Sequence, residues 1–211
     1  MSSTAYNAQG ATLKIGTTST AKTITGISQA NPPVVTATAH GFSDGAVVKI
    51  TAVVGMTQIN SKVGVVKVID ANSFSFNGVD STAYTAYSSA GSATPTQVTL
   101  TNFKGWNGFA GQASDIDVTD LNSVAKEYRA GLVDNGELQL DVQTLDTDEG
   151  QMALFGSRAA SGPASAFLLT FANGKTRTFN AYCKQFSETG AVDGIIMSQA
   201  TCRITGAVTR G

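Results

Sequence analysis

Short apolar runs that alternate with polar residues and end in turn residues recur along this chain of 211 residues. A period of two is the pattern of a β-strand that buries one face, because successive side chains of a strand point to opposite sides. Segment Glu137–Val142 is an example, with aliphatic side chains facing inward and polar ones outward. Glycine, serine, threonine, alanine and valine dominate the composition, which suits strands joined by many turns. The sequence therefore predicts a mainly β fold, a β-sandwich or barrel.

Segment Asp146–Ala160 has the period of an amphipathic helix, and it is the one α-helix that we expect. Asp146 is suited to cap the first turn, and Glu149 follows three residues later, as in a capping box. The Gly-Pro step within residues 161–163 is expected to end the helix. The apolar face of this helix is predicted to be formed by Met152, Phe155 and Ala159, with Leu154 beside it.

The spacing of turn residues changes near residue 24 and changes back near residue 93. Residues 24–93 hold five or six short strand patterns, the last of them at 84–87, and small-residue segments at 16–23 and 88–96 flank them like linkers. We therefore expect a small all-β, barrel-like domain over residues 24–93. It would interrupt a first domain made of residues 1–23 and 94–211.

A long polar connection, Ala113–Gly136, is the most unusual stretch of the predicted first domain. It begins as an alternating strand at residues 115–118 and then loses any helix or strand period. We expect that strand to pair with Glu137–Val142, and residues 123–129 to form a short helix on contact with a partner. Long connections in compact domains usually carry function or wait for a partner. The alternative is a surface loop folded over its own domain.

The glycine-rich segment 104–111 carries the single tryptophan of the chain and is predicted to be the tip of a hairpin. Its glycines do not lie between a strand and a helix with the spacing of a nucleotide-binding loop. Two aromatic side chains on this tip either fold back on the domain or contact a neighbouring molecule, namely Trp106 and Phe109.

Little in the sequence is suited to build a catalytic or metal site. His40 is the only histidine and lies in a His-Gly turn, where we interpret it as bonded to the backbone. Cys183 and Cys202 lack metal-ligand spacing and are interpreted as reduced core thiols. Asp115 and Asp117 form a carboxylate pair on one strand face, which we interpret as solvated or pore-facing. We expect no enzyme activity, no metal and no cofactor.

The charge balance excludes one class of partner. The net charge is −1 and only 14% of residues are charged, so the chain lacks the basic face that wrapping DNA requires. A pore through which DNA merely passes needs no such face. A surface of low charge also suits a protein that buries itself against its own copies, although a glycine- and threonine-rich β-protein would show it as well. No signal segment or run of ~18 apolar residues is present, so we expect synthesis in the cytoplasm and no membrane contact.

The long connection resembles the corresponding region of the major tail tube proteins of long-tailed, non-contractile bacteriophages (siphophages). The resemblance covers residues 97–211 together with 11–15, and residues 24–92 resemble a small β-module of phage virion proteins. The following helix matches at Asp148, Gly150, Gln151 and Leu154. The matching positions in the connection are Ile116-Asp117-Val118-Thr119, Leu121, Ser123, Ala125-Lys126-Glu127-Tyr128, Gly131-Leu132, Asp134 and Gly136.

The resemblance implies a structural subunit of a virion tail. Six copies would form a ring, and rings would stack into a tube around a lumen through which DNA and a tape measure protein pass; tail-tip and terminator proteins would be further partners. The long connection would reach an adjoining ring through Asp120, Leu121, Ser123, Lys126, Glu127, Tyr128, Arg129 and Leu132. The candidate lumen face is formed by Asp115, Asp117, Glu137 and Asp141.

Two other functions remain open from the sequence. The chain is also compatible with the tube protein of a contractile injection or secretion machine. Alternatively, the inserted domain, expected on the tube exterior, would bind host-surface glycan with Tyr84 and Tyr87 as stacking aromatics.

Overall fold

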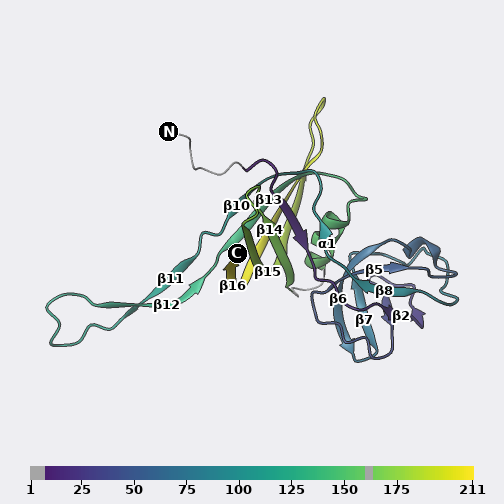
Figure 1. Ribbon diagram of the computed structural model, residues 1–211, viewed down its shortest axis with the longest axis horizontal. Helices are drawn as coiled ribbons and strands as arrows, with labels where there is room; N and C mark the ends of the chain where they lie inside the picture. The colour runs from purple at the N-terminus through teal and green to yellow at the C-terminus, as the bar shows by residue number, and fades with distance from the viewer. Residues whose placement is uncertain (1–7, 160–163) are drawn as a thin grey trace.

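The computed structural model describes residues 8–159 and 164–211. Within these residues the chain forms sixteen β-strands, one short 3-10 helix and one α-helix (Figure 1). The strands belong to two seven-stranded antiparallel sheets and one two-stranded sheet. The prediction of a mainly β fold with one α-helix is confirmed.

The main sheet has the strand order β10-β13-β16-β15-β14-β1-β9. Its inward face carries the aliphatic positions of the alternating patterns, so that Leu138 and Leu140 of β13 are fully buried, and Phe167 of β14 stacks on Phe179 of β15. Strands β10 and β9 are the outer strands of this sheet, and α1 lies against β9 at Gly150. The strands are β1 (Thr12–Ile15), β9 (Val98–Thr99), β10 (Phe103–Gly108), β13 (Glu137–Gln143), β14 (Ser165–Thr170), β15 (Thr176–Thr189) and β16 (Met197–Arg210).

Helix α1 (Glu149–Ala159) packs on the inner face of the main sheet, and two details of its prediction are wrong. Asp148, not Asp146, caps it: the Asp148 carboxylate accepts a hydrogen bond of 2.8 Å from the Gln151 N–H. Leu154 is buried and Met152 packs against the core as predicted, whereas Phe155 is 42% exposed. Ala153 and Ser157 complete the buried face. The predicted helix stop at residues 161–163 and the side chain of Ala159 lie outside the described residues.

The second sheet comprises residues 22–95, which we call the small unit, in the strand order β2-β8-β5-β6-β7-β4-β3. The two edge strands are separated by only two residues in the chain. The Ile24 N–H bonds to the Gly91 carbonyl and the Thr25 N–H to the Thr36 carbonyl, so the sheet curls on itself like a small barrel. Its strands are β2 (Lys22–Thr23), β3 (Gly26–Ile27), β4 (Val34–Thr36), β5 (Val47–Thr51), β6 (Val63–Asp70), β7 (Ser73–Asn77) and β8 (Ser92–Pro95), with the 3-10 helix η1 (Thr57–Ile59).

The ends of the small unit differ from the prediction. Residues 88–96, expected to be a linker, contain β8, which pairs with both β2 and β5. Residues 84–87, expected to close the unit as a strand, form none. Ala93 of β8 is fully buried, so the small residues of this segment reflect close packing rather than flexibility.

The small unit packs directly against α1. Val47, Val63 and Val65 of β5 and β6 belong to the same apolar core as the main sheet and α1. Gly156 of α1 and Gly78 after β7 make the close approach possible, because a Cβ atom on Gly156 would lie 2.7 Å from the Asn77 carbonyl oxygen. The two units therefore share the helix as a common wall. Whether they are separate domains with the expected boundaries stays a prediction.

Strands β11 (Gln112–Asp117) and β12 (Tyr128–Asp134) form a two-stranded hairpin, which we call the arm. Figure 1 shows the arm extending away from the main sheet on the side opposite the small unit. The expected pairing of residues 115–118 with 137–142 is wrong, because β13 lies between β10 and β16 instead. Residues 123–129 form no helix; the second half of the predicted loop is strand β12.

Candidate interaction surface: the β11–β12 arm

The ten residues at the tip of the arm, 118–127, are held by short-range hydrogen bonds. The Val118 N–H donates to the Glu127 carbonyl at 3.0 Å and closes the ladder. The Asp120 carboxylate accepts from the Asn122 N–H at 2.8 Å, an Asx turn that aspartate favours because its short side chain reaches the backbone two residues on. The Asp117 carboxylate accepts from the Thr119 hydroxyl and N–H, and these bonds lower the pKa of Asp117. The tip is thus locally ordered without a core.

The arm presents apolar side chains to solvent on both faces. Leu121 and Val124 at the tip are fully exposed and Leu132 on β12 is 91% exposed. Tyr128, Ile116 and Val133 are each more than half exposed. Burial of one such side chain stabilises by roughly 1.5–3 kcal/mol, and contiguous exposed apolar surface marks a site of association. The arm therefore has the composition of a contact surface, and Ile116 and Val118 do not anchor it to a core as expected.

The base of the arm is fixed to the main sheet by polar contacts. The Asp134 carboxylate forms an ion pair of 2.5 Å with the Arg203 guanidinium of β16. The Asn135 amide donates to the Gly206 carbonyl at 2.7 Å. The Gly136 N–H donates to Asp134 at 2.9 Å, and this bond, with that from Arg203, lowers the pKa of Asp134. These contacts set the direction of the arm.

Asn135 and Arg203 were not predicted as functional, and Asp134 and Gly136 entered only through the resemblance. The Asp-Asn-Gly sequence at residues 134–136 favours a tight reversal between two strands, but the chain does not reverse there. Strand β12 pairs with β11 and β13 pairs with β10, so these residues join two successive strands on one side of a long hairpin. Gly136 has a φ of +72° at this joint.

The other predicted arm residues lie along the tip and β12. Ser123 bonds locally, its N–H donating to the Asp120 carbonyl at 3.1 Å. Lys126 and Arg129 form no ion pair or hydrogen bond through their side chains within the described residues. The Glu127 N–H donates to the Thr119 hydroxyl at 3.0 Å. Contact of these residues with an adjoining ring stays a prediction.

The aromatic residues of segment 104–111 fold back on their own unit, so the predicted hairpin tip is wrong. Residues 103–108 are strand β10, paired with β13. Trp106 stacks on Phe103 and on Phe171, with ring centroids 5.7 Å and 5.8 Å apart, and Phe109 packs edge-on against Phe179. The sequence left open whether Trp106 and Phe109 fold back on the domain or contact a neighbouring molecule, and in this structure they fold back.

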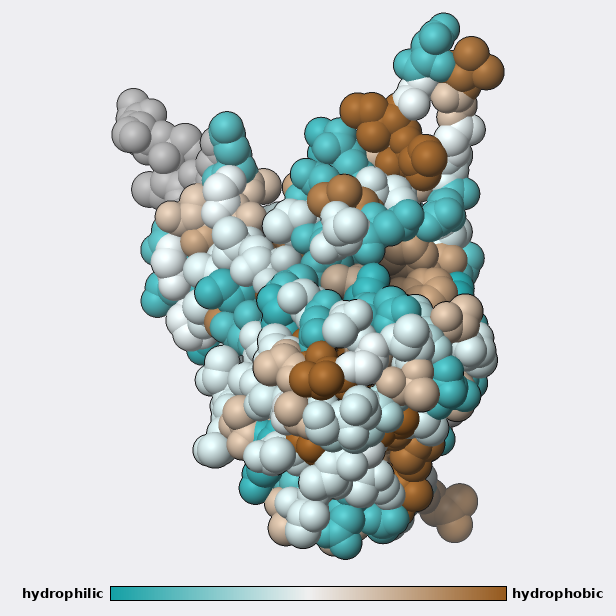
Figure 2. Space-filling model, turned by 90° about the vertical axis from the view of Figure 1, so that its right-hand side faces the viewer, coloured by the Kyte–Doolittle hydropathy of each residue, from teal (hydrophilic) through white to brown (hydrophobic). Residues whose placement is uncertain are grey.

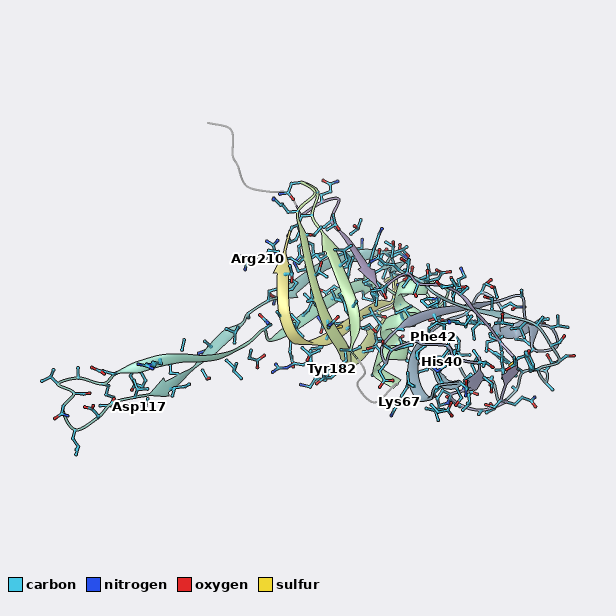
Figure 3. All side chains as sticks on the ribbon, turned by 60° about the horizontal axis from the view of Figure 1, so that its bottom comes forward. His40, Phe42, Lys67, Asp117, Tyr182 and Arg210 are labelled. Carbon is cyan, nitrogen blue, oxygen red and sulfur yellow. The ribbon has the colours of Figure 1, made fainter. Side chains whose placement is uncertain are left out.

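The four candidate lumen residues do not share one strand pair. Asp115 and Asp117 lie on the arm, whereas Glu137 and Asp141 lie on β13 of the main sheet. Figure 3 shows Asp117 far out on the arm, distant from Tyr182 on the main sheet. Glu137 forms an ion pair of 3.0 Å with Lys184, and Asp141 accepts from the Gln199 amide at 2.9 Å. The polar face of the main sheet around β13 thus mixes both charges.

His40 is buried in the small unit, and both of its ring nitrogens bond to the backbone. Nδ1 accepts from the Phe42 N–H at 3.0 Å, which leaves the Nε2 hydrogen to donate to the Asp70 carbonyl at 2.9 Å. Figure 3 shows the His40 and Phe42 labels side by side in this unit. The interpretation of His40 as a backbone-bonded turn residue is confirmed.

Cys183 and Cys202 lie directly opposite each other on β15 and β16, and both are free and buried. The Cys202 thiol donates to Cys183; this bond lowers the pKa of Cys183 and, together with burial, raises that of Cys202. The interpretation as reduced core thiols holds. The sequence does not show whether the two cysteines are close, because it does not reveal which residues of the two strands pair with each other.

The two tyrosines expected to stack on glycan are both partly buried, and glycan binding stays a prediction. The Tyr87 hydroxyl donates to the backbone carbonyls of Ile24 and Ala90, and both Tyr84 and Tyr87 pack against the core of the small unit. Among the described residues, no group of three or more His, Cys, Asp or Glu side chains is placed to hold a metal ion. None of the described helices has the length and apolar character to cross a membrane.

Comparisons with known proteins match parts of the chain. Residues 30–99 match the family model of the ubiquitin-activating enzyme E1 FCCH domain. A structure of the anti-feeding prophage (AFP) baseplate aligns with a TM-score of 0.43 and 11% identity over 56% of this chain and 85% of the other. A chain from the tail of an empty GTA particle with C6 symmetry aligns with a TM-score of 0.44 and 18% identity, over 55% and 86%. No curated protein sequence matches.

Proposed function

We propose that the chain is a structural virion protein, the major tail tube subunit of a siphophage-like particle, and that it acts by assembly rather than catalysis. Copies would form hexameric rings that stack into a tube through which DNA and a tape measure protein pass. The observation that carries this proposal is the arm, which holds Leu121, Val124 and Leu132 in solvent with no cover among the described residues.

The open edge of the main sheet supports the same proposal. Strand β10 pairs with β13 on one side and, within the described part of the chain, with no strand on the other. Such an edge presents unpaired backbone groups that invite another strand. The β10 edge leads directly into the arm at residue 112. Joining of sheets from successive subunits would cover these edges and close a barrel.

The small unit would lie on the exterior of such a tube. It packs on α1, on the side of the molecule opposite the arm, and three of its valines belong to the same apolar core as the main sheet. The tube would need no basic lumen, because DNA only passes through it; the near-neutral chain is compatible with that requirement.

The test is the assembly state of the purified full chain, measured by sedimentation and electron microscopy, alone and with a tail initiator complex. We expect stacked hexameric rings. A protein that stays monomeric under every tail-assembly condition would overturn the proposal. Limited proteolysis gives a second measurement: cleavage between Asp120 and Gly136 should be rapid in the monomer and suppressed in tubes, since the arm would then be buried.

A further inference from the structure

Cys183 of β15 and Cys202 of β16 form a cross-strand pair of thiols on the inner face of the main sheet. The two residues are partners in the register of the strands, and both side chains are buried. Their thiols are hydrogen-bonded to each other. They are the only cysteines of the chain, so any disulfide within one molecule must join these two. The proposed assembly makes no use of this pair.

The backbone around the pair has the geometry that a disulfide requires. The Ile204 N–H donates to the Gly136 carbonyl, on the β13 side of β16. Residues two apart in a strand direct their N–H and C=O groups to the same side, so Cys202 also bonds toward β13. The Cys183 N–H donates to the Ser157 hydroxyl of α1 at 3.1 Å, away from β16. The two cysteines are therefore a non-hydrogen-bonded pair, in which Cα atoms lie about 4.5 Å apart, within the range of about 4.4–6.8 Å found in disulfides.

Strand β15 loses its neighbour β14 just before this pair. The pairing of β14 with β15 ends at Ala181, two residues before Cys183. Strands β15 and β16 then continue as a hairpin that projects from the molecule, and Figure 2 shows hydrophobic residues gathered on it at the top. Val192, Ile195 and Ile196 of this hairpin are each more than half exposed. Strands with few neighbours open locally more readily than strands inside a sheet, so a small reagent can reach the pair.

We propose that Cys183 and Cys202 are a redox-active dithiol site, in which hydrogen peroxide forms a disulfide that cross-links β15 to β16. The oxidant has to be small, because Cys183 is only 3% exposed and Cys202 is fully buried. The biological meaning rests on the proposed function: a virion protein made in a reducing cytoplasm meets oxidising surroundings after release. The reaction itself requires only the folded chain.

Cys183 is the thiol that reacts first. The hydrogen bond from the Cys202 thiol and the nearby Arg158 guanidinium lower the pKa of Cys183, and the thiolate is the reactive form. Its sulfur attacks one oxygen of hydrogen peroxide, the O–O bond breaks, and the products are a sulfenic acid on Cys183 and water. The Cys202 sulfur then attacks the Cys183 sulfur, and the S–O bond breaks as the hydroxyl leaves with the Cys202 proton as a second water. Two thiols are thus oxidised to one disulfide while one peroxide is reduced to two waters.

Peptide mapping of the reduced full chain, treated with dilute hydrogen peroxide, tests the bond. Trypsin cleaves after Lys184 and so separates the two cysteines into peptides 178–184 and 185–203. We expect mass spectrometry to find these peptides joined in protein that runs as a monomer on a non-reducing gel, and separate again after dithiothreitol. Cys202→Ala, treated in the same way, is the matched control and should give no joined peptides. Wild-type peptides that stay separate would overturn the proposed site.

The melting temperature tests whether the cross-link stabilises the strand pair. Closing a loop of roughly 20 residues should raise the melting temperature by about 5–10 °C, and dithiothreitol should reverse the rise. Peroxide also oxidises methionine, which dithiothreitol does not repair, and the treated Cys202→Ala variant measures that effect. A bond that forms without a rise would overturn the stabilising role. A chain that forms the bond but never assembles would instead overturn the proposed function and leave this site in place.

Discussion

Gly156 of α1 lies against Gly78 at the end of β7, so closely that a Cβ atom on Gly78 would lie 2.9 Å from the Gly156 Cα atom. This contact joins the helix of the main sheet to the small unit. A methyl group at position 156 would press on the Asn77 carbonyl and on Val65, and neither is a flexible side-chain end that can move aside. The junction is therefore the place where the fold tolerates least added volume.

The first prediction concerns this junction. Gly156→Ala should lower the free energy of unfolding by about 1–3 kcal/mol, the usual cost of overpacking a close contact. Gly105→Ala on β10 is the control, because its Cβ would meet nothing within 4 Å, and it should change stability by less than about 0.5 kcal/mol. Urea unfolding of both variants measures the difference. Equal stability of the two would show that α1 and the small unit are not tightly packed.

The second prediction separates assembly from folding at the arm. Leu121→Ser with Val124→Ser should leave the free energy of unfolding of the monomer within about 0.5 kcal/mol, because both side chains are already in solvent. The same variant should assemble poorly, since its partner contact loses two apolar groups. Ile69→Ser, an exposed apolar residue of the small unit, is the control. Normal assembly of the arm variant in sedimentation would remove the arm from the interface.

The third prediction concerns His40. His40→Ala leaves the Phe42 N–H and the Asp70 carbonyl without their partners and removes a ring packed 5.3 Å from that of Phe74. We expect a loss of about 3 kcal/mol or more, from the cavity and the unsatisfied backbone groups together. His40→Phe keeps the ring and loses only the hydrogen bonds, so its loss should be smaller. An alanine variant with wild-type stability in chemical denaturation would contradict this assignment.

The fourth prediction is a pH dependence at the base of the arm. The Gly136 N–H and Arg203 lower the pKa of Asp134, so its charged form is the one favoured in the folded chain. The stabilisation that the ionised Asp134 carboxylate provides is fully present above the ordinary aspartate pKa of about 3.9. It is lost as the pH falls through the lower pKa that Asp134 has in the folded chain. The protection factors of amides within residues 112–134, which correct for the intrinsic pH dependence of exchange, should therefore fall below about pH 4. In Asp134→Asn the exchange should already be fast at neutral pH and show no such step.

The sequence predicts the core strands well, because apolar and polar residues alternate along a strand that buries one of its faces. The pattern at 137–142 correctly assigns Leu138, Leu140 and Val142 to the interior. Alternation of apolar and polar residues does not predict strand β12, because both of its faces are in solvent. No core therefore imposes a period of two on residues 128–134. The length of the connection predicts a functional role for the arm, whereas its conformation depends on a pairing partner that periodicity does not identify.

Close packing explains two further differences. The buried face of α1 carries small residues because Gly150 lies against the Leu100 backbone and Gly156 against Asn77, so the aromatic Phe155 turns outward instead. The serine, alanine and proline of β8 look like a linker in the sequence, although Ala93 is fully buried between its neighbours. In both places small side chains mark the nearness of two backbones, which composition alone does not distinguish from flexibility.

The position of the arm on one side of the molecule and of the small unit on the other has a consequence for growth. If the arm of each copy contacts the next copy, every stack has polarity: one terminus displays unused arms and the other displays the surfaces that receive them. Elongation at the two termini would proceed by different encounters and at different rates. A protein that caps one terminus would have to imitate the receiving surface, and a protein that caps the other would have to imitate the arm, so a single cap could not end growth in both directions.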